Sequence, residues 1–175
     1  MTVTLDGLRI EIDALDEKII ALLAQRLDGV FFTGSYATGL CIAQAVAPKL
    51  LKLQLELGGK DPTYVRADAD PLAAAESLAD GAMYNTGQSC CSVERIYVHE
   101  SLHDAFVAHF LATVAGFRLG DPMDAATYIG AITRAPQLDV LEAQVADARA
   151  KGATLRCGGH RLPGPGNWFA PTVFT

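Results

Sequence analysis

The sequence predicts an α/β fold preceded by one long N-terminal α-helix. Half of the 175 residues are hydrophobic, which is enough to bury a core and argues against intrinsic disorder. After about residue 29, short strand-like runs alternate with longer amphipathic runs, with glycine- or proline-containing turns between them. Nearer the N-terminus, apolar residues recur at spacings of three and four, which is typical of one face of a helix.

The clearest helix is expected over residues 8–27. Its apolar seam comprises Leu5, Leu8, Ile12, Leu15, Ile19 and Leu22, and Asp6 is a suitable N-cap. This helix can pack on the body of the protein or pair with a second copy of the chain. About three heptads are marginal for an isolated coiled coil, and both alternatives stay open.

Residues 29–57 predict a strand, a turn, a helix and a second strand. The apolar run 29–32 leads into a glycine-containing turn over 33–39, and a helix is expected over 40–50. Residues 51–57 alternate strictly between leucine and polar side chains, which predicts a half-buried strand. A strand, a glycine-containing turn and a helix together present backbone N–H groups to a phosphate, although this signal alone is weak.

Residues 58–175 continue the alternation of strands and helices. Asp70 and Pro71 open one helix, Ser101 is expected to cap another, and Gly152 ends a third. The predicted helices cover 72–84, 102–117 and 136–151, and the predicted strands cover 62–66, 95–99, 153–157 and 168–174.

The main candidate for chemistry is a cysteine on a polar turn. Cys90 follows the stretch 84–89, between a helix and a strand, and Glu56 stands near the end of a strand before Gly58 and Gly59. The two glycines allow another backbone or a ligand to come close. A thiol and a carboxylate at one site form a nucleophile and a general base. Each also has a plainer interpretation, as a buried apolar thiol and as a solvated carboxylate.

Three stretches together resemble successive signatures of the aldehyde dehydrogenase superfamily. They are Phe-Phe-Thr-Gly-Ser at 31–35, Glu-Leu-Gly-Gly-Lys at 56–60 and Asn-Thr-Gly-Gln-Ser-Cys at 85–90, in the family's order and at about its spacing. The resemblance covers residues 29–175. It implies an aldehyde dehydrogenase-like three-layer fragment, in which 29–57 end the dinucleotide-binding domain and 58–175 form part of the catalytic domain.

The resemblance also implies a mechanism. The Cys90 thiolate would attack an aldehyde, a hydride would pass to NAD or NADP, and Glu56 would activate the water that hydrolyses the resulting thioester. Cys91 is the alternative thiol, but the Gly-Gln-x-Cys spacing selects Cys90. Asn85 and Gln88 are expected to shape the loop. The cofactor-binding residues implied are Thr33, Gly34, Ser35, Gly39 and Leu57, with Tyr36 standing where relatives commonly have a smaller threonine.

Residues 1–28 carry a resemblance of their own. The stretch 8–26 is similar to the first helix of an all-helical chorismate mutase, and Arg9 and Arg26 match two arginines that bind substrate carboxylates in that family. The remaining helices of that fold have no counterpart in the sequence, so we expect no mutase site. We interpret residues 1–28 as a foreign segment joined to a dehydrogenase piece, by natural rearrangement or by engineering.

Composition and charge exclude several classes of binding partner. The net charge is −6 and no basic cluster is present, so nucleic acid and anionic membranes are not expected as partners. The four cysteines have neither CxxC spacing nor histidines at zinc spacing, so no metal site is expected. No apolar run reaches membrane-spanning length, and a cytoplasmic location is expected. The expected partners are a small-molecule aldehyde and a second copy of the chain, through the N-terminal helix and exposed strand edges.

Two functions from different classes stay open. The family's oxyanion-stabilising asparagine, its adenosine-side lysine and strands, its Glu-Phe-Gly-Pro signature and its oligomerisation strand find no match in this sequence. Retention of Cys90 and Glu56 favours a dehydrogenase that depends on other chains for activity. The unmatched pieces favour a catalytically inactive remnant or an oligomeric interaction module.

Overall fold

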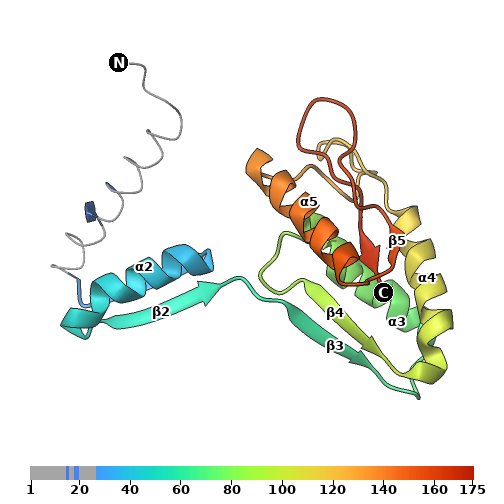
Figure 1. Cartoon of the computed structure of the whole chain (residues 1–175), viewed down its shortest axis with the longest axis horizontal. Coiled ribbons are helices and arrows are strands. Elements are labelled where there is room, and N and C mark those ends of the chain that lie inside the picture. Colours follow the sequence, from blue (N-terminus) through green and yellow to red (C-terminus); the bar gives the residue numbers. More distant parts are fainter. Residues whose placement is uncertain (1–14, 16–17, 20–26) are drawn as a thin grey trace. The chain divides into compact units, whose positions relative to one another are not determined.

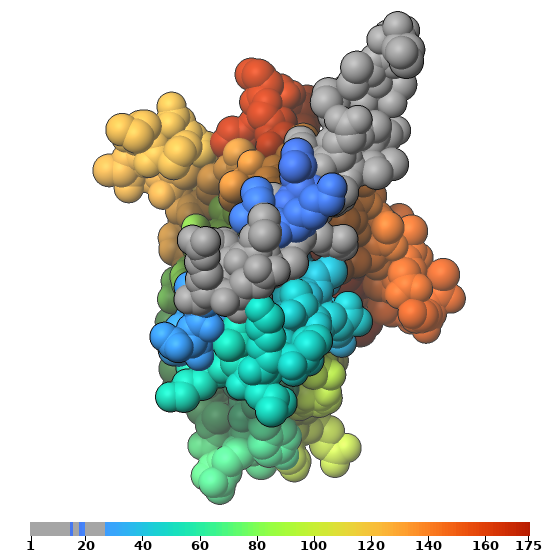
Figure 2. Space-filling view, turned by 90° about the vertical axis from the view of Figure 1, so that its left-hand side faces the viewer, coloured from blue at the N-terminus to red at the C-terminus, as the bar shows by residue number. Residues whose placement is uncertain are grey.

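The computed structural model describes residues 15, 18–19 and 27–175 (Figure 1). Two compact units divide the chain, Met1–Gly58 and Gly59–Thr175. The helix expected over residues 8–27 lies mostly outside the described residues, and within it Leu15, Lys18 and Ile19 are helical. The side chains of Leu15 and Ile19 are 56% and 51% exposed, and this short dark-blue stretch lies at the surface in Figure 2.

Residues 27–58 of the first unit, all of which the structure describes, contain two parallel strands joined by one α-helix and a 3-10 turn. Strand β1 (Gly29–Gly34) pairs with β2 (Lys52–Leu57), and α2 (Tyr36–Val46) followed by the 3-10 turn η1 (Ala47–Lys49) connects them. Two buried side chains of α2 form a core cluster with apolar side chains of β1, of β2 and of the residue before β2: Ile42 and Val46, against Val30, Phe32, Leu51 and Leu53. Phe31, on the opposite face of β1, is 80% exposed. One face of the strand pair is therefore covered by α2.

Helix α2 begins at Tyr36, four residues before the predicted start at Leu40. The reason is an N-cap: the Ser35 hydroxyl accepts a hydrogen bond from the backbone N–H of Thr38 at 3.2 Å. Glycine at position 39 does not delay the helix, because its N–H donates to Ser35 O at 2.9 Å.

The second unit starts with a β-α-β arrangement followed by a further helix. Strand β3 (Asp61–Val65) pairs in parallel with β4 (Val93–Val98), and α3 (Pro71–Met83) lies between them in sequence. Helix α4 (His103–Gly116) packs along α3 (Figure 1). The core of this part joins both helices to β3 through Val65, Ala75, Ala79, Phe106, Phe110 and Val114.

The remainder of this unit contains α5 (Ala135–Ala150) and the antiparallel pair β5 (Leu155–Cys157) and β6 (Val173–Phe174). Its core is a second cluster made of Ile132, Leu138, Val145 and Phe169. Helix α5 ends at Ala150, and the expected stop signal, Gly152, follows it with a φ of 91° that a glycine adopts without strain.

Besides the start of α2, two further local predictions were wrong. Ser101 does not cap α4: a 3-10 turn, η3 (Glu100–Leu102), precedes that helix, and the His99 ring accepts the Ser101 N–H at 3.3 Å. The strand predicted over 168–174 is reduced to β6, because Phe169 instead forms an isolated bridge with Arg161 and the following backbone bonds to other loops.

The α/β class expected from the sequence is confirmed. In the part of the chain that the structure describes, the strands form three two-stranded sheets, β1-β2, β3-β4 and β5-β6. Among the described helices, none combines the length and the apolarity needed to cross a bilayer.

Candidate active site

The loop that carries the cysteines has an uncommon backbone. It begins at the end of α3 with the 3-10 turn η2 (Tyr84–Gly87). Asn85, Thr86 and Gly87 have φ values of 49°, 60° and 68°. Asparagine and glycine adopt the left-handed region readily, whereas a β-branched threonine there is strained. Such strain persists only where surrounding contacts fix it, and it is common at functional sites.

Hydrogen bonds supply those contacts. The Asn85 side-chain amide donates to Gln88 O at 3.0 Å, within the loop. The Thr86 hydroxyl accepts from the Gly130 N–H at 3.2 Å, and Gln88 Oε1 accepts from the Thr133 N–H at 2.9 Å. Asn85 and Gln88 therefore shape the loop, as the sequence led us to expect.

Cys90 lies exposed at the end of this loop, next to Gly59. A Cβ atom on Gly59 would lie 3.1 Å from Cys90 O and 2.8 Å from Asp61 Oδ1. Because the first of these atoms is backbone, a side chain at position 59 would displace the cysteine loop. The prediction that these glycines admit another backbone is confirmed for Gly59, whereas a Cβ atom on Gly58 would meet no described residue within 4 Å apart from its neighbours in the chain.

The neighbouring thiol, Cys91, is the one that polar groups surround. Its Sγ lies 3.2 Å from the Tyr84 hydroxyl and 3.3 Å from the Ser89 hydroxyl. Hydrogen bonds from Ser89, and then from Tyr84, lower the pKa of Cys91 below its usual value. Sequence reasoning missed Tyr84 and Ser89 as partners of a thiol; the available signals were a tyrosine at the end of α3 and a serine directly before the cysteine pair.

In the first unit, the expected general base lies opposite a predicted cofactor residue. The register of the parallel strands pairs Thr33 with Glu56 and Gly34 with Leu57, so all four stand at the carboxyl ends of β1 and β2. Glu56 is exposed, and its Oε1 accepts a hydrogen bond from the Gln54 side chain at 3.0 Å. Ligands of open α/β sheets bind at the carboxyl ends of the strands.

Gly39 has a packing role that the sequence did not reveal. It is buried within α2, and a Cβ atom there would lie 2.8 Å from Leu57 Cδ2. The absence of a side chain lets α2 approach β2 closely, next to the strand ends that carry Glu56 and Leu57.

The start of α2 is a position that suits an anion. The N-terminus of α2 directly follows the carboxyl end of β1, and the first turn of α2 has no acidic residue. Backbone N–H groups and the helix dipole at such a position favour an anion. Gly34 and Ser35, which the sequence predicts to contact a cofactor, stand at this position, and both are exposed.

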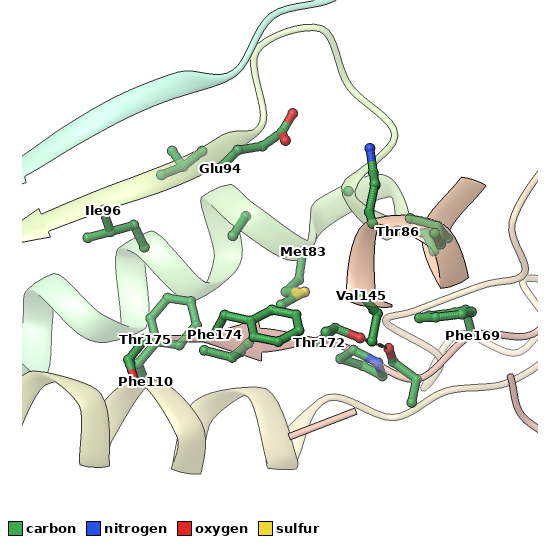
Figure 3. A pocket seen from close by; sticks show the side chains of 18 of the residues that line it. Met83, Thr86, Glu94, Ile96, Phe110, Val145, Phe169, Thr172, Phe174 and Thr175 are labelled. Carbon is green, nitrogen blue, oxygen red and sulfur yellow. Dashed lines mark hydrogen bonds between the residues drawn. The ribbon is translucent and has the colours of Figure 1, made fainter. Parts of the chain in front are cut away.

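A cavity of about 560 Å³ lies in the second unit (Figure 3). Its walls are mostly apolar, from α3, β4, α4, α5 and β6, and include Met83, Ile96, Phe110, Val145 and Phe174. Thr86 and Gly87 bring the cysteine loop to one wall, but neither Cys90 nor Cys91 lines the cavity. Glu94, at another wall, forms an ion pair with Lys60. The cavity and the thiols are therefore separate features.

Glu56 belongs to the first unit and Cys90 to the second. The first unit also contains all of the expected cofactor residues: Thr33, Gly34, Ser35, Gly39 and Leu57. Within the described residues, no group of three or more histidine, cysteine, aspartate or glutamate side chains is arranged to hold a metal ion.

Comparison with known proteins identifies the family. The sequence model of the aldehyde dehydrogenase family matches residues 17–175. The match therefore begins earlier than Gly29, the residue at which the resemblance seen in the sequence begins. A succinate-semialdehyde dehydrogenase [NADP(+)] from Mycolicibacterium paratuberculosis is 39% identical over 150 residues, which cover 86% of this chain and 32% of that protein. A protein of the same name from Mycobacterium ulcerans is 37% identical, covering 86% and 33%.

Solved structures give the same result. A 3,6-anhydro-L-galactose dehydrogenase is 38% identical with a TM-score of 0.85, over 91% of this chain and 34% of that one. Aldehyde dehydrogenase C from Pseudomonas syringae is 32% identical with a TM-score of 0.83, over 88% and 33%. This chain belongs to the aldehyde dehydrogenase family, and it spans about one third of the length of the curated relatives it matches.

Proposed function

We propose that this chain carries the nucleophile and the general base of an NAD- or NADP-dependent oxidation of an aldehyde to a carboxylic acid. The observation that carries the proposal is the family match, which contains both Cys90 and Glu56. The exposure of Cys90 on a hydrogen-bonded loop supports its role as nucleophile. The exposure of Glu56 at the carboxyl end of β2 supports its role as base.

In the proposed reaction, the Cys90 thiolate attacks the carbonyl carbon and forms a carbon–sulfur bond, which gives a thiohemiacetal. Loss of hydride from this carbon leaves a thioester on Cys90. NAD or NADP, when bound, supplies the hydride acceptor. Glu56 then takes a proton from a water molecule whose oxygen attacks the thioester carbon, and the carboxylic acid leaves as the Cys90 thiolate is restored.

The cofactor would bind at the N-terminus of α2. Gly34 and Ser35 would contact its phosphates, and Thr33 and Leu57 would border its nicotinamide end at the strand termini. Gly39 would contribute by allowing α2 to approach Leu57, because a side chain there has no room. Relatives are named as NADP-dependent, and one solved neighbour is described in complex with NAD+ and octanal, so both cofactors belong in the test.

The test is nicotinamide reduction by the purified chain with a panel of aldehydes that includes succinate semialdehyde and octanal. We expect turnover with the unaltered chain and none with Cys90→Ala. Glu56→Gln should release about one equivalent of reduced nicotinamide per chain and then stall, because acylation precedes the step that needs the base. Undiminished turnover by Cys90→Ala would refute the assignment of the nucleophile.

We propose self-association as a second function, because a specific observation favours it. The outer edges of the described two-stranded sheets are unpaired with other described strands, and Phe31 and Leu50 are 80% and 93% exposed. Unpaired edges and exposed apolar side chains favour contact with another chain. Sedimentation velocity of the full chain should show a dimer or a larger species, and a monomer at all concentrations would contradict this.

We also propose a cytoplasmic location. All four cysteines are free in the structure, and free thiols are typical of a reducing compartment. Fractionation of expressing cells, with immunoblotting, would test this assignment.

A further inference from the structure

Thr86 holds a backbone conformation that its own side chain disfavours. It stands between Asn85 and Gly87, and the three residues have φ values of 49°, 60° and 68°. Asparagine and glycine tolerate the left-handed region, whereas the two branches at the threonine Cβ crowd the backbone there. Strain of this kind persists only where contacts from the rest of the structure fix the turn.

One such contact comes from a residue that is 44 positions further along the chain. The Thr86 hydroxyl accepts a hydrogen bond from the backbone N–H of Gly130 at 3.2 Å. Thr86 is half-buried at a wall of the apolar cavity, where Figure 3 shows its side chain. A partly buried N–H without an acceptor costs free energy, so this bond favours the turn that supplies the acceptor.

The loop transmits the position of Thr86 to Cys90, which follows four residues later. The Asn85 side-chain amide donates to Gln88 O at 3.0 Å, and the Gln88 N–H donates to Asn85 O at 3.1 Å. These two bonds close residues 85–88 into one turn, so a shift of Thr86 moves the residues that follow. At the other end of the loop, the Cys90 carbonyl lies against Gly59. The position of Cys90 therefore depends on a support at each end.

We propose that Thr86 is a positioning residue for the proposed nucleophile, Cys90. Its hydroxyl fixes the left-handed turn through Gly130, and the turn fixes the place from which the Cys90 sulfur attacks the aldehyde carbon. Attack requires the reacting atoms to be held about 3–3.5 Å apart and aligned, so a displaced loop lowers the rate of bond formation. The inference rests on the proposed function, because the position of Cys90 affects this rate only if Cys90 is the nucleophile.

A purely structural role for Thr86 predicts a different result. If its bond to Gly130 only stabilised the second unit, losing the bond would lower the free energy of unfolding and leave the rate of folded chains unchanged. Positioning predicts a slower reaction in chains that stay folded. The aldehyde concentration that gives half of the maximal rate should not change, because Thr86 acts through the loop backbone and not on the bound aldehyde.

The test compares Thr86→Val, which keeps the branched shape and removes the acceptor, with Thr86→Ser, which keeps the acceptor and removes the branch. Stopped-flow absorbance would measure the first turnover of nicotinamide reduction at saturating aldehyde. We expect this rate to fall about twofold to tenfold in Thr86→Val, the effect of one hydrogen bond, and to recover in Thr86→Ser. Thr113→Val is the matched control, because the Thr113 hydroxyl donates to His109 O within α4 and not to the cysteine loop. Its rate should equal that of the unaltered chain.

A second measurement needs no aldehyde. In nuclear magnetic resonance spectra of the isotope-labelled chain, the backbone amide signal of Cys90 should shift in Thr86→Val and return in Thr86→Ser. Hydrogen exchange at the Gly130 amide should accelerate about twofold to tenfold in Thr86→Val alone. If the unaltered chain oxidised no aldehyde, the dehydrogenase function would be rejected, and these two signals would still decide whether Thr86 positions Cys90.

An active, folded Thr86→Val variant with an unchanged first-turnover rate would overturn the proposal, and so would an unmoved Cys90 signal. Equal slowing in Thr86→Ser would also overturn it, because the branch and not the hydroxyl would then matter. Equal slowing in Thr113→Val would show that the effect is not specific to the loop. If Thr86→Val does not fold, Thr86→Gly takes its place, since glycine relaxes the left-handed turn and also lacks the acceptor.

Discussion

Gln88 and Thr133 connect two parts of the second unit that are 45 residues apart in sequence. The Gln88 side-chain oxygen accepts the backbone N–H of Thr133 at 2.9 Å, just before α5 begins at Ala135. Thr86 makes a parallel contact, from its hydroxyl to the N–H of Gly130 at 3.2 Å. Both bonds use side chains of the cysteine loop as acceptors for backbone N–H groups of the segment that precedes α5.

Gln88→Ala should free the Thr133 amide. Loss of one hydrogen bond corresponds to about 0.5–1.5 kcal/mol, so amide exchange at Thr133 should accelerate about twofold to tenfold. Hydrogen exchange followed by nuclear magnetic resonance would measure this. Gln88→Glu is the matched control, because its carboxylate keeps an acceptor in place, and the Gly130 amide serves as an internal reference. Equal acceleration at Gly130 and Thr133 would instead indicate general loosening of the unit.

Asp70→Ala should destabilise the second unit through α3. The Asp70 carboxylate caps this helix by accepting the N–H groups of Leu72 at 2.9 Å and Ala73 at 3.2 Å. Removing such a cap costs about 0.5–2 kcal/mol of unfolding free energy, which urea titration would detect. Asp70→Asn retains the acceptor and should cost much less. Asp68→Ala removes a nearby carboxylate outside the cap, and an equal loss there would contradict the capping argument.

Ala75→Leu should disturb the contact between α3 and α4. Ala75 is fully buried in the cluster that contains Phe106 and Phe110 of α4, so added carbon atoms have no free space. Overpacking of this kind costs about 1–3 kcal/mol. Ala73→Leu makes the same chemical change at an exposed position of the same helix and should leave the unfolding midpoint nearly unchanged. If both variants unfolded at the same midpoint, α3 and α4 would have to move apart at little cost, and the packing argument would be wrong.

Local signals predicted much of this fold and part of the candidate site. The strict alternation over 51–57 predicted β2, and Asp70 with Pro71 marked the start of α3, because both features act over neighbouring residues. The three consecutive left-handed residues at 85–87 and the bonds to Gly130 and Thr133 were not predictable, since they depend on contacts distant in sequence. The hydrogen bonds around Cys91 were not predicted for a related reason. They form only because the chain after Tyr84 turns back and brings the cysteine pair to the end of α3.

Tyr128 makes the second unit sensitive to alkaline pH. Its hydroxyl donates to Asp80, its ring stacks on Phe117 with 4.1 Å between centroids, and burial followed by the Asp80 carboxylate raises the pKa of Tyr128 to about 12. A pKa raised above its unfolded value of 10.0 means that the native state holds the proton more tightly. The stabilising contribution is therefore complete below pH 10 and declines as the pH rises toward about 12.

Tyr128→Phe should remove this part of the pH dependence, because phenylalanine keeps the stacked ring and has no proton to lose. Between pH 9 and 12 the melting temperature should fall less steeply for the variant than for the unaltered chain, since the two proteins differ only at this hydroxyl. Tyr97→Phe is the control, because this side chain is 54% exposed. Its melting temperature should depend on pH as that of the unaltered chain does. Parallel slopes for Tyr128→Phe and the unaltered chain would mean that the Tyr128 proton is bound no more tightly in the native state than in the unfolded one.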